Sequence, residues 1–458
     1  MNLVILQFFQ TPNTKHQTPN TKHQTPNTKH QTPNKQLIKR MKVFKFGGAS
    51  VKNAEGVKNV ASIINSFKNE QLVIIVSAMG KTTNALEKVV EAFFEERKEE
   101  SLELFRVIKE NHLTTAKYLL VKNYNETYTH LNSFFTEVEW LLHDKPVQPF
   151  DYYYDQVVCV GELLSTSIVS AYLNETGITN KWLDVRDILR TDNNFRDANV
   201  DFDYTKQQVT SLMDFNETSM YVTQGFIGST DQNESTTLGR EGSDYTASIF
   251  ANLLNGESLT IWKDVDGVMS ADPRKFPRAT LINELSFYEV IEMAFYGAQV
   301  IHPKTIKPLQ NKKIPLLVKS FIDPTLPGTI ISSKPVKNLP PVIVLKENQV
   351  LVNLQTGDYS FVGEKPMSKL YELFEELNIK PNLIQTAAIN VQLCLDDRTE
   401  KIEQLAGKAS EIFEVQIERN LTLLTIRHYN EALLTEMTLG KNIVLTQKTK
   451  QTVQVLYH

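Results

Sequence analysis

The nine residues KVFKFGGAS, from Lys42 to Ser50, constrain the fold of this chain more than any other stretch. A short β-type run places Lys45 just before the turn Gly47-Gly48. Glycines after a strand let backbone N–H groups approach a phosphate closely, and a neighbouring lysine supplies positive charge. The spacing fits neither the Walker A pattern nor GxGxxG. The stretch therefore predicts either phosphate chemistry or an ordinary strand-to-loop turn.

Residues 1–40 are predicted to be a disordered extension. The heptapeptide QTPNTKH occurs three times from Gln10 to His30, and a fourth copy begins at Gln31. Each copy contains Pro and lacks a large apolar residue, which excludes a helix and a heptad seam. Met41 directly precedes KVFKFGG. We therefore predict that Met41 is the natural start, which mass spectrometry of the native N-terminus would test.

The composition is that of a globular protein with two or three domains, since 41% of the 458 residues are hydrophobic and 22% charged. Residues 1–40 carry six Lys or Arg and no Asp or Glu, so the net charge of −4 becomes −10 for the remainder. This balance disfavours a nucleic-acid partner. The separated Cys159 and Cys394 predict reduced thiols and a cytoplasmic location. The sequence contains no continuous apolar stretch of about 18 residues, so we expect no transmembrane helix.

Short apolar runs alternate with helical patterns over residues 41–334 and predict an α/β domain of three layers, α/β/α, with a largely parallel sheet. Strands are expected at 71–76, 182–185, 220–222 and 258–261. The charge-rich segments 86–120 and 131–142 are expected to be surface helices. Ligands of such sheets bind beyond the carboxyl ends of the strands, so the loops that follow these strands are candidate site segments.

Two of these segments leave alternatives open. In SAMGKTTN, Thr82 or Thr83 is expected either to cap a helix or to help build a site. The apolar segment from Tyr154 to Leu173 carries Glu162 in its middle. Burying a lone carboxylate is costly unless it meets a cation. Glu162 is therefore expected to face either a basic side chain of the protein or the ammonium group of a substrate.

Later segments place charged residues beside predicted strand ends. In TTLGREGSDYTA, Arg240 stands between glycines before a helix expected to begin near Ser243 or Asp244. Helix N-termini bind anions, and an arginine can hold a carboxylate through two hydrogen bonds. IWKDVDGVMSADPRKF predicts either a polar turn or a nucleotide pocket with Lys263 or Arg274 at the phosphates.

Together these segments resemble the aspartate kinases of the amino acid kinase superfamily. The motifs that carry the resemblance, over roughly Lys42 to Ser333, are KFGGAS, SAMGKTTN, CVGELLSTSI, WLDVRDILRTD, VTQGFIGST, TTLGREGSDYTA, WKDVDGVMSADPR and YGAQVIHPKTI. The resemblance implies transfer of the ATP γ-phosphoryl group to the β-carboxylate of L-aspartate. It also implies a place at the start of lysine, threonine and methionine biosynthesis, with ATP and Mg²⁺ as cofactors.

The resemblance assigns roles around the substrate. Arg240 and Ser243 would hold the α-carboxylate of aspartate, Glu162 would meet its ammonium group, and Thr83 would help place the reacting side chain. Asp244 would orient Lys45 or help to place the Mg²⁺ that ATP carries. No general base is needed, because a carboxylate is already ionised at neutral pH.

The resemblance also implies the ATP site and shows departures from the family pattern. The implied ATP-binding residues are Lys45, Gly47, Gly48, Lys263, Asp264, Met269, Arg274 and Gln299. Ala49 stands where Thr is frequent, and Glu241 replaces a frequent Gly, which adds negative charge beside an anion site. Lys263 replaces a small hydroxyl residue, and Gln299 replaces the usual Lys. We hypothesise that Lys263 substitutes for the phosphate-facing charge lost at Gln299.

The C-terminal third is expected to be regulatory. After a linker at 335–348, the pattern βαββαβ over 349–417 resembles an ACT module, and 418–458 resembles a shortened second one. In the family such modules bind feedback amino acids and form the dimer, so a homodimer and an amino-acid effector are implied. The ligand loop reads KPNLIQTAAIN, with Asn382, Ala387 and Ala388 where acidic and hydroxyl partners are usual. Feedback by a lysine-type effector is therefore the weaker expectation and dimerisation the stronger.

Two other functions are compatible with the sequence. One is a kinase of the same fold that acts on a different acidic substrate. The other is a catalytically inactive nucleotide or amino-acid sensor that works through its ACT modules. Retention of Lys45, Arg240 and Asp244 favours an enzyme, whereas the changes at Glu241 and Gln299 leave the sensor open.

Overall fold

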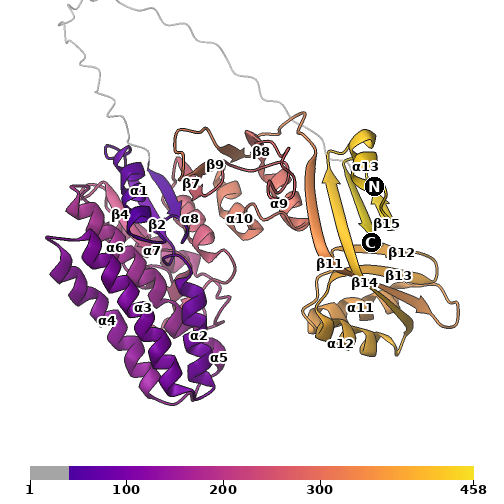
Figure 1. The fold of residues 1–458 in the computed structure, drawn as a ribbon, viewed down its shortest axis with the longest axis horizontal. Coiled ribbons are helices and arrows are strands. Elements are labelled where there is room, and N and C mark those ends of the chain that lie inside the picture. Colours follow the sequence, from indigo (N-terminus) through magenta and orange to yellow (C-terminus); the bar gives the residue numbers. More distant parts are fainter. Residues whose placement is uncertain (1–40) are drawn as a thin grey trace, which may run out of the picture. The chain divides into compact units, whose positions relative to one another are not determined.

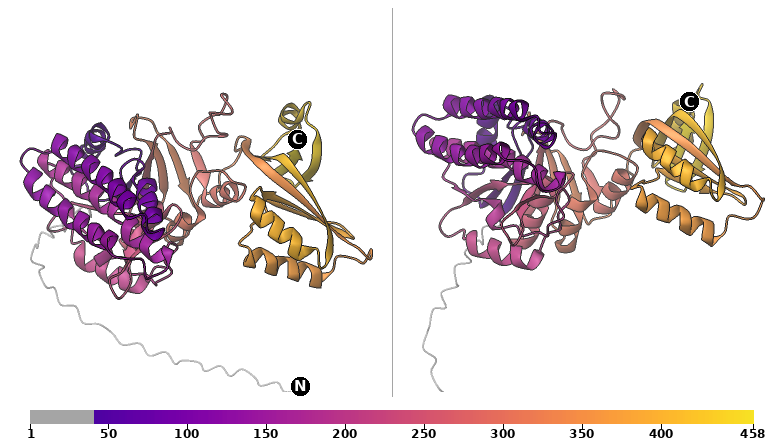
Figure 2. Two further views of the ribbon diagram at one scale, coloured as in Figure 1. Left: turned by 60° about the horizontal axis from the view of Figure 1, so that its bottom comes forward. Right: turned by 90° about the horizontal axis from the view of Figure 1, so that it is seen from below.

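A computed structural model of the chain describes residues 41–458, and Figure 1 and Figure 2 show it from three directions. The predictions made for residues 1–40 lie outside the described residues. The described chain forms two main sheets with their helices: the last strand of the N-terminal one ends at Ser332, and the C-terminal one begins at Val342.

The N-terminal domain is built on an eight-stranded sheet with the order β3-β4-β2-β1-β7-β9-β10-β8. Its strands are β1 (Lys42–Phe46), β2 (Leu72–Val76), β3 (Lys181–Trp182), β4 (Met220–Gln224), β7 (Ser258–Lys263), β8 (Glu284–Ser286), β9 (Leu316–Ser320) and β10 (Thr329–Ser332). All pairs from β3 to β9 are parallel, and β10 is antiparallel to β9. Every residue of β2 is buried, as expected for a strand covered on both faces.

Helices cover both faces of this sheet (Figure 1, Figure 2). One layer contains α1 (Ala54–Asn65), α2 (Thr82–Phe94), α3 (Lys98–Leu119), α4 (Tyr124–His143), α5 (Phe150–Val158) and α6 (Val160–Glu175). The other contains α7 (Phe202–Leu212), α8 (Gly242–Leu253), α9 (Phe287–Phe295) and α10 (Pro303–Lys312). Helix α6 packs on β2, β3 and β4, whereas α8 packs on β1, β2 and β7. The predicted three-layer α/β/α domain with a largely parallel sheet is confirmed.

Two local expectations need correction. Helix α2 begins at Thr82 after the capping residue Lys81, so neither Thr82 nor Thr83 is the cap. The Thr82 hydroxyl instead donates to the Met79 carbonyl at 2.7 Å. The stretch Phe150–Glu175 is long and apolar enough to cross a membrane by length and composition, with a mean hydropathy of 1.4. Because 83% of that window is buried, the stretch is accounted for as core of the domain.

The C-terminal region is a six-stranded antiparallel sheet with the order β12-β13-β11-β14-β16-β15. Its elements are β11 (Val342–Thr356), α11 (Glu364–Glu376), β12 (Leu383–Thr386), β13 (Asn390–Asp396), α12 (Thr399–Ala409), β14 (Phe413–Arg427), α13 (Glu431–Thr438), β15 (Ile443–Lys448) and β16 (Thr452–Tyr457). The expected βαββαβ order therefore runs from β11 to β14, with a shorter unit after it.

The two modules share strands, which corrects the boundaries expected from sequence. Strands β11 and β14 each have 15 residues and run through both halves of the sheet. Residues 342–346 of β11 pair with 423–427 of β14, which in turn pair with β16. The expected linker thus ends at Pro341, and the second module includes residues from before the first. Residues 346–349 are polar and coincide with a shift in strand register, so the sequence pattern did not predict that this strand begins as early as Val342.

A buried cation joins the C-terminal sheet to helix α9. The Arg427 side chain, at the end of β14, is only 4% exposed. Its guanidinium donates to both carboxylate oxygens of Glu289, at 2.6 and 2.9 Å, and to Glu292 at 2.8 Å. A buried charge needs such partners, and the two-pronged geometry fixes the direction of the contact. The C-terminal sheet is therefore attached to the N-terminal domain through α9.

Candidate active site

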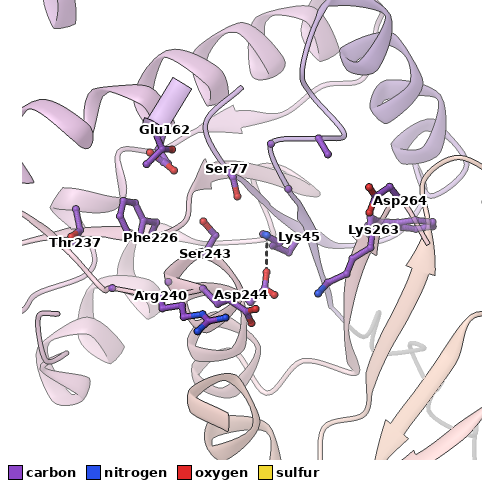
Figure 3. Close-up of a pocket in the computed structure, with 18 of the residues that line it drawn as sticks. Lys45, Ser77, Glu162, Phe226, Thr237, Arg240, Ser243, Asp244, Lys263 and Asp264 are labelled. Carbon is purple, nitrogen blue, oxygen red and sulfur yellow. Dashed lines mark ion pairs between the residues drawn. The ribbon is translucent and has the colours of Figure 1, made fainter. Parts of the chain in front are cut away.

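The carboxyl ends of β1, β2, β4 and β7 open onto a cavity of about 610 Å³ (Figure 3). These strands are parallel, so the loops that follow them emerge at the same edge of the sheet. The residues predicted from sequence that line this cavity are Lys45, Gly47, Gly48, Thr83, Glu162, Arg240, Ser243, Asp244, Lys263 and Asp264. The structure thus brings most of the predicted site residues to one place.

Lys45 lies between two sides of the cavity that carry different charged residues (Figure 3). Its ammonium group forms an ion pair of 2.7 Å with Asp244, and the two side chains are only 13% and 4% exposed. Lys45 comes from β1 and Asp244 from the first turn of α8. Glu162 and Arg240 lie on one side of Lys45, and Lys263 lies on the other. A directed positive charge therefore sits between the two sides.

The turn after β1 fits closely against the loop after β2. An added Cβ at Gly48 would lie 2.6 Å from the Ala78 carbonyl oxygen and 2.8 Å from that of Gly80. The Gly80 N–H donates to the Gly48 carbonyl at 3.0 Å. At Gly47 the nearest atom to an added Cβ is the Lys45 ammonium nitrogen, at 3.5 Å. Only the second glycine is therefore required for packing, and the first faces the cavity.

Helix α8 presents its N-terminus to the cavity. An added Cβ at Gly225, just after β4, would lie 2.6 Å from the Ser243 Cβ, so the strand end and the first helical turn are in close contact. The side chain of Arg240, in the preceding loop, is exposed and lines the cavity. Within residues 41–458 it forms no ion pair or side-chain hydrogen bond. Arg240 is thus available to an anion from solution.

From the sequence we expected Glu241 to add negative charge beside an anion site. In the structure its carboxylate and backbone also have a structural role. Glu241 caps α8 in the left-handed conformation, with φ 53°, a region that favours glycine. Its carboxylate accepts a hydrogen bond of 2.9 Å from the His302 N–H at the start of α10. His302 itself caps α10 by accepting from the Lys304 N–H. These contacts fasten the loop that carries Arg240 to helix α10.

Glu162 is buried without a cationic side chain bonded to it. The residue is 2% exposed, and one carboxylate oxygen accepts from the Ala78 N–H at 3.2 Å. The other oxygen has no hydrogen-bond partner among the described residues. Burial raises the pKa of Glu162 to about 8, although the Ala78 N–H and the charge of Lys45 act in the opposite direction. An incoming ammonium group would find an acceptor here.

Sequence analysis missed a second buried carboxylate in the same apolar segment. Asp155 accepts from the backbone N–H groups of Arg196 and Thr237 at 3.0 and 2.8 Å, and from the Thr237 hydroxyl at 2.7 Å. Burial raises its pKa to about 6, against these hydrogen bonds. Further cavity-lining residues that we did not predict are Ser77, Tyr154, Arg196, Phe226 and Thr237. The available signal was a carboxylate, Asp155, placed next to the apolar run that follows it in the chain.

The remaining predicted ATP residues line an adjoining cavity of about 600 Å³. Met269, Arg274 and Gln299 lie there, and Lys263 and Asp264 line both cavities. The Arg274 side chain is 86% exposed and pairs with Asp272 at 2.9 Å. The Lys263 ammonium donates to the Val300 carbonyl at 2.7 Å, next to Gln299 in the chain. The two cavities thus meet at the end of β7.

Comparison with known proteins decides the family. The sequence profile of the amino acid kinase family matches residues 40–320. Aspartokinase 2 of Arabidopsis thaliana, named as chloroplastic, is 33% identical over 408 residues, 84% of this chain and 73% of that protein. The lysine-sensitive aspartokinase 3 of Escherichia coli (strain K12) is 31% identical over 84% of this chain and 86% of its own. This chain belongs to the aspartokinases.

The solved structure of an E. coli aspartokinase agrees with this assignment. Aspartokinase III in complex with aspartate and ADP superposes on this aspartokinase with a TM-score of 0.76 and 27% sequence identity. The match covers 91% of this chain and 96% of the other, so it includes both the cavity-bearing domain and the C-terminal sheet region.

The two glycines after β1 make a matched pair for mutagenesis. Gly48→Ala forces its Cβ against two backbone carbonyls and must displace the turn whose N–H groups are predicted to bind phosphate. A displacement of this kind lowers kcat/KM for ATP by about 100-fold. Gly47→Ala meets only ordinary contacts and is expected to cost much less. Steady-state kinetics on both purified variants checks this, and equal losses would contradict the packing argument.

Proposed function

We propose that this aspartokinase transfers the γ-phosphoryl group of ATP to the β-carboxylate of L-aspartate, giving 4-phospho-L-aspartate and ADP. The observation that carries the proposal is the position of Lys45 between the Arg240 side and the Lys263 side of one cavity. The superposed E. coli enzyme, which holds aspartate and ADP, supports the same pair of ligands here.

Both reactants are anions, so the site must offset their repulsion and hold them in line. The Lys45 ammonium would lie against the transferring phosphoryl group, where negative charge concentrates in the transition state. Asp244 would keep the ammonium pointed at that position through the 2.7 Å ion pair. The N–H groups of Gly47 and Gly48 would donate to phosphate oxygens. The β-carboxylate attacks directly, since it is ionised at neutral pH.

Four polar side chains would hold the aspartate. Arg240, which has no protein partner among residues 41–458, would grip the α-carboxylate, with Ser243 at the α8 N-terminus beside it. The free oxygen of Glu162 would accept from the ammonium group. Thr83, in the first turn of α2, would help place the reacting side chain. This arrangement would recognise an amino acid with a second carboxylate.

The nucleotide would occupy the side of the cavity at the end of β7. Lys263 and Asp264 line both the active-site cavity and the adjoining cavity of about 600 Å³. The adjoining cavity is also lined by Met269, Arg274 and Gln299. Lys263 uses one ammonium hydrogen on the Val300 carbonyl and keeps two for phosphate oxygens. This contact favours the hypothesis that Lys263 replaces the charge lost at Gln299.

The residues present fit a Mg²⁺ ion that arrives with ATP. Within residues 41–458 no group of three or more His, Cys, Asp or Glu side chains could enclose a metal by itself. An ATP-bound Mg²⁺ takes most of its ligands from phosphate oxygens and water, so a single carboxylate is enough. Asp244, which lines the cavity beside Lys45, could contribute it. When bound, the ion would screen the charge of the phosphates.

Other properties follow from the proposed reaction or from the fold. The activity places the chain in amino-acid biosynthesis, at the start of the route to lysine, threonine and methionine. The ACT-like modules would build a homodimer and carry an amino-acid effector site. A cytoplasmic location agrees with the buried free thiols of Cys159 and Cys394.

A hydroxamate assay tests the reaction directly. Purified chain with ATP, Mg²⁺, L-aspartate and hydroxylamine is expected to give aspartyl hydroxamate, because the acyl phosphate is trapped. Lys45→Met should remove this product while the chain stays folded. Product with glutamate or N-acetylglutamate alone would favour the same-fold kinase for another substrate. No product with any of the three would favour the inactive sensor.

The raised pKa of Glu162 predicts how aspartate binding depends on pH. Only the ionised form pairs with an ammonium group, so KM for aspartate should fall as the pH rises through about 8. Binding at pH 7 should release a proton, which calorimetry in buffers of different ionisation enthalpy would detect. Glu162→Gln should raise KM about 100-fold, abolish proton release and flatten the pH profile.

The matched control for that variant is Glu91→Gln at an exposed position of α2, which should leave KM for aspartate and its pH dependence unchanged.

The pH dependence of protein stability gives an independent test of the Glu162 carboxyl group. Folded Glu162 holds a proton between pH 4.5 and 8 that the unfolded chain has lost, so its contribution to stability declines as pH rises through this window. A wild-type KM that does not change with pH would contradict the assignment of Glu162.

The role of Lys263 is tested at the nucleotide side. Lys263→Ala removes a charge-assisted contact to phosphate and is expected to raise KM for ATP about tenfold. The control is Lys319→Ala, because Lys319 lies opposite Trp262 on the neighbouring strand and lines neither cavity. An unchanged KM for ATP in Lys263→Ala would refute the compensation for Gln299.

A further inference from the structure

Arg240 lines two cavities of this chain, and we propose that the second of these, which is distinct from the nucleotide-side cavity, binds a small multivalent anion that competes with aspartate for Arg240 and so regulates the enzyme. The inference rests on the proposed function. The cavity has a volume of about 840 Å³ and is lined by residues 297–303, by residues 378–382 and by parts of β11, β13 and α12. Arg240 and Glu241 belong to both this cavity and the active-site cavity.

The positive charges of the second cavity are less well paired than the negative ones. Arg240, Lys380 and Arg398 line it, and within residues 41–458 none of them forms a side-chain ion pair. The acidic lining residues already have partners. Glu241 accepts from the His302 N–H, Glu347 pairs with Lys275 at 2.8 Å, and Asp396 accepts from Gln349 and Asn382. An anion would therefore supply what the cavity lacks.

A cationic amino acid would find its place taken by the protein. The Lys346 ammonium donates to the Asn382 side-chain oxygen at 2.7 Å and lies 3.8 Å from the Asp396 carboxylate. The Asn382 amide nitrogen donates to Asp396 and to the buried Gln349. Gly297 leaves room for this lysine, since an added Cβ there would overlap the Lys346 side chain. The Lys346 ammonium thus already occupies the position beside Asn382 and Asp396 that the ammonium group of a ligand would need.

The cationic side chains around this cavity also act on His302, which lines it next to Glu241. His302 has a lowered pKa, chiefly through burial, and the charges of Arg240, Lys304 and Lys380 lower it further, against Glu241. Lys380 comes from the C-terminal region and Arg240 from the N-terminal domain, so both groups of cations act on one imidazole. His302 is also the residue whose N–H holds Glu241.

Because Arg240 lines both cavities, an anion bound in the second cavity should affect the binding of aspartate in the active site. A guanidinium that binds an anion in the second cavity is less available to the α-carboxylate of aspartate. The anion should therefore raise KM for aspartate and leave kcat nearly unchanged. Couplings between ligand sites are typically about fivefold or more, so an increase of this size is expected.

The test measures ADP release with aspartate varied, at saturating ATP and Mg²⁺, with inorganic phosphate, with succinate or with neither. Potassium chloride holds the ionic strength constant. The test variant is Lys380→Ala combined with Arg398→Ala, and the matched control is Lys365→Ala with Lys369→Ala, which removes two exposed charges of α11 outside the cavity. Phosphate and succinate distinguish a phosphate-bearing ligand from a carboxylate one.

The proposal is supported if at least one probe raises KM for aspartate about fivefold or more in the wild type and the control, and not in the test variant. It is overturned if neither probe does so, or if the effect persists in the test variant, because the anion then acts at the active-site cavity. Absence of ADP release without any probe would count against the proposed function. Normal turnover that neither probe affects would count against this inference alone.

Discussion

The ion pair between Lys45 and Asp244 is the interaction on which the rest of the site depends. Transfer between two anions requires a positive charge at a defined point, and a flexible lysine supplies it only when another group fixes its direction. Asp244 does so from the first turn of α8, while Lys45 is held within β1. The close contact of Gly225 with Ser243 then sets how near the helix can approach the sheet.

The elements around this pair were predictable because their signals are local. The buried run of β2, the glycines after β1 and the polar loop before α8 are each recognisable within a few residues. A parallel sheet places the ends of its strands together, so the loops after β1 and before α8 could be expected at one edge of the sheet. The assignment of Lys45, Glu162 and Arg240 to one site came from the resemblance to aspartate kinases, and the structure brings all three to one cavity. Glu162 in particular was identified because its charge has no partner within its own apolar segment.

Other features depend on contacts between distant segments and gave no comparable signal. Asp155 and Glu162 look alike in sequence, yet one is saturated by Thr237 and Arg196 and the other retains a free oxygen. The direction of Glu241 toward His302 follows from a backbone conformation that its residue type does not favour. The hydrogen bond from Lys263 to Val300 joins residues that only the folded chain brings near.

The two long strands of the C-terminal sheet have a consequence for how such proteins diversify. Because β11 enters the second module before the first begins, and β14 returns to it afterwards, the first module is an insertion within the second. Recombination at a single point between them would leave one half without a strand. Arg427 on the shared β14 also supplies the buried anchor to α9. The two modules therefore share both their central strands and their anchor, so neither can be removed without breaking the sheet of the other.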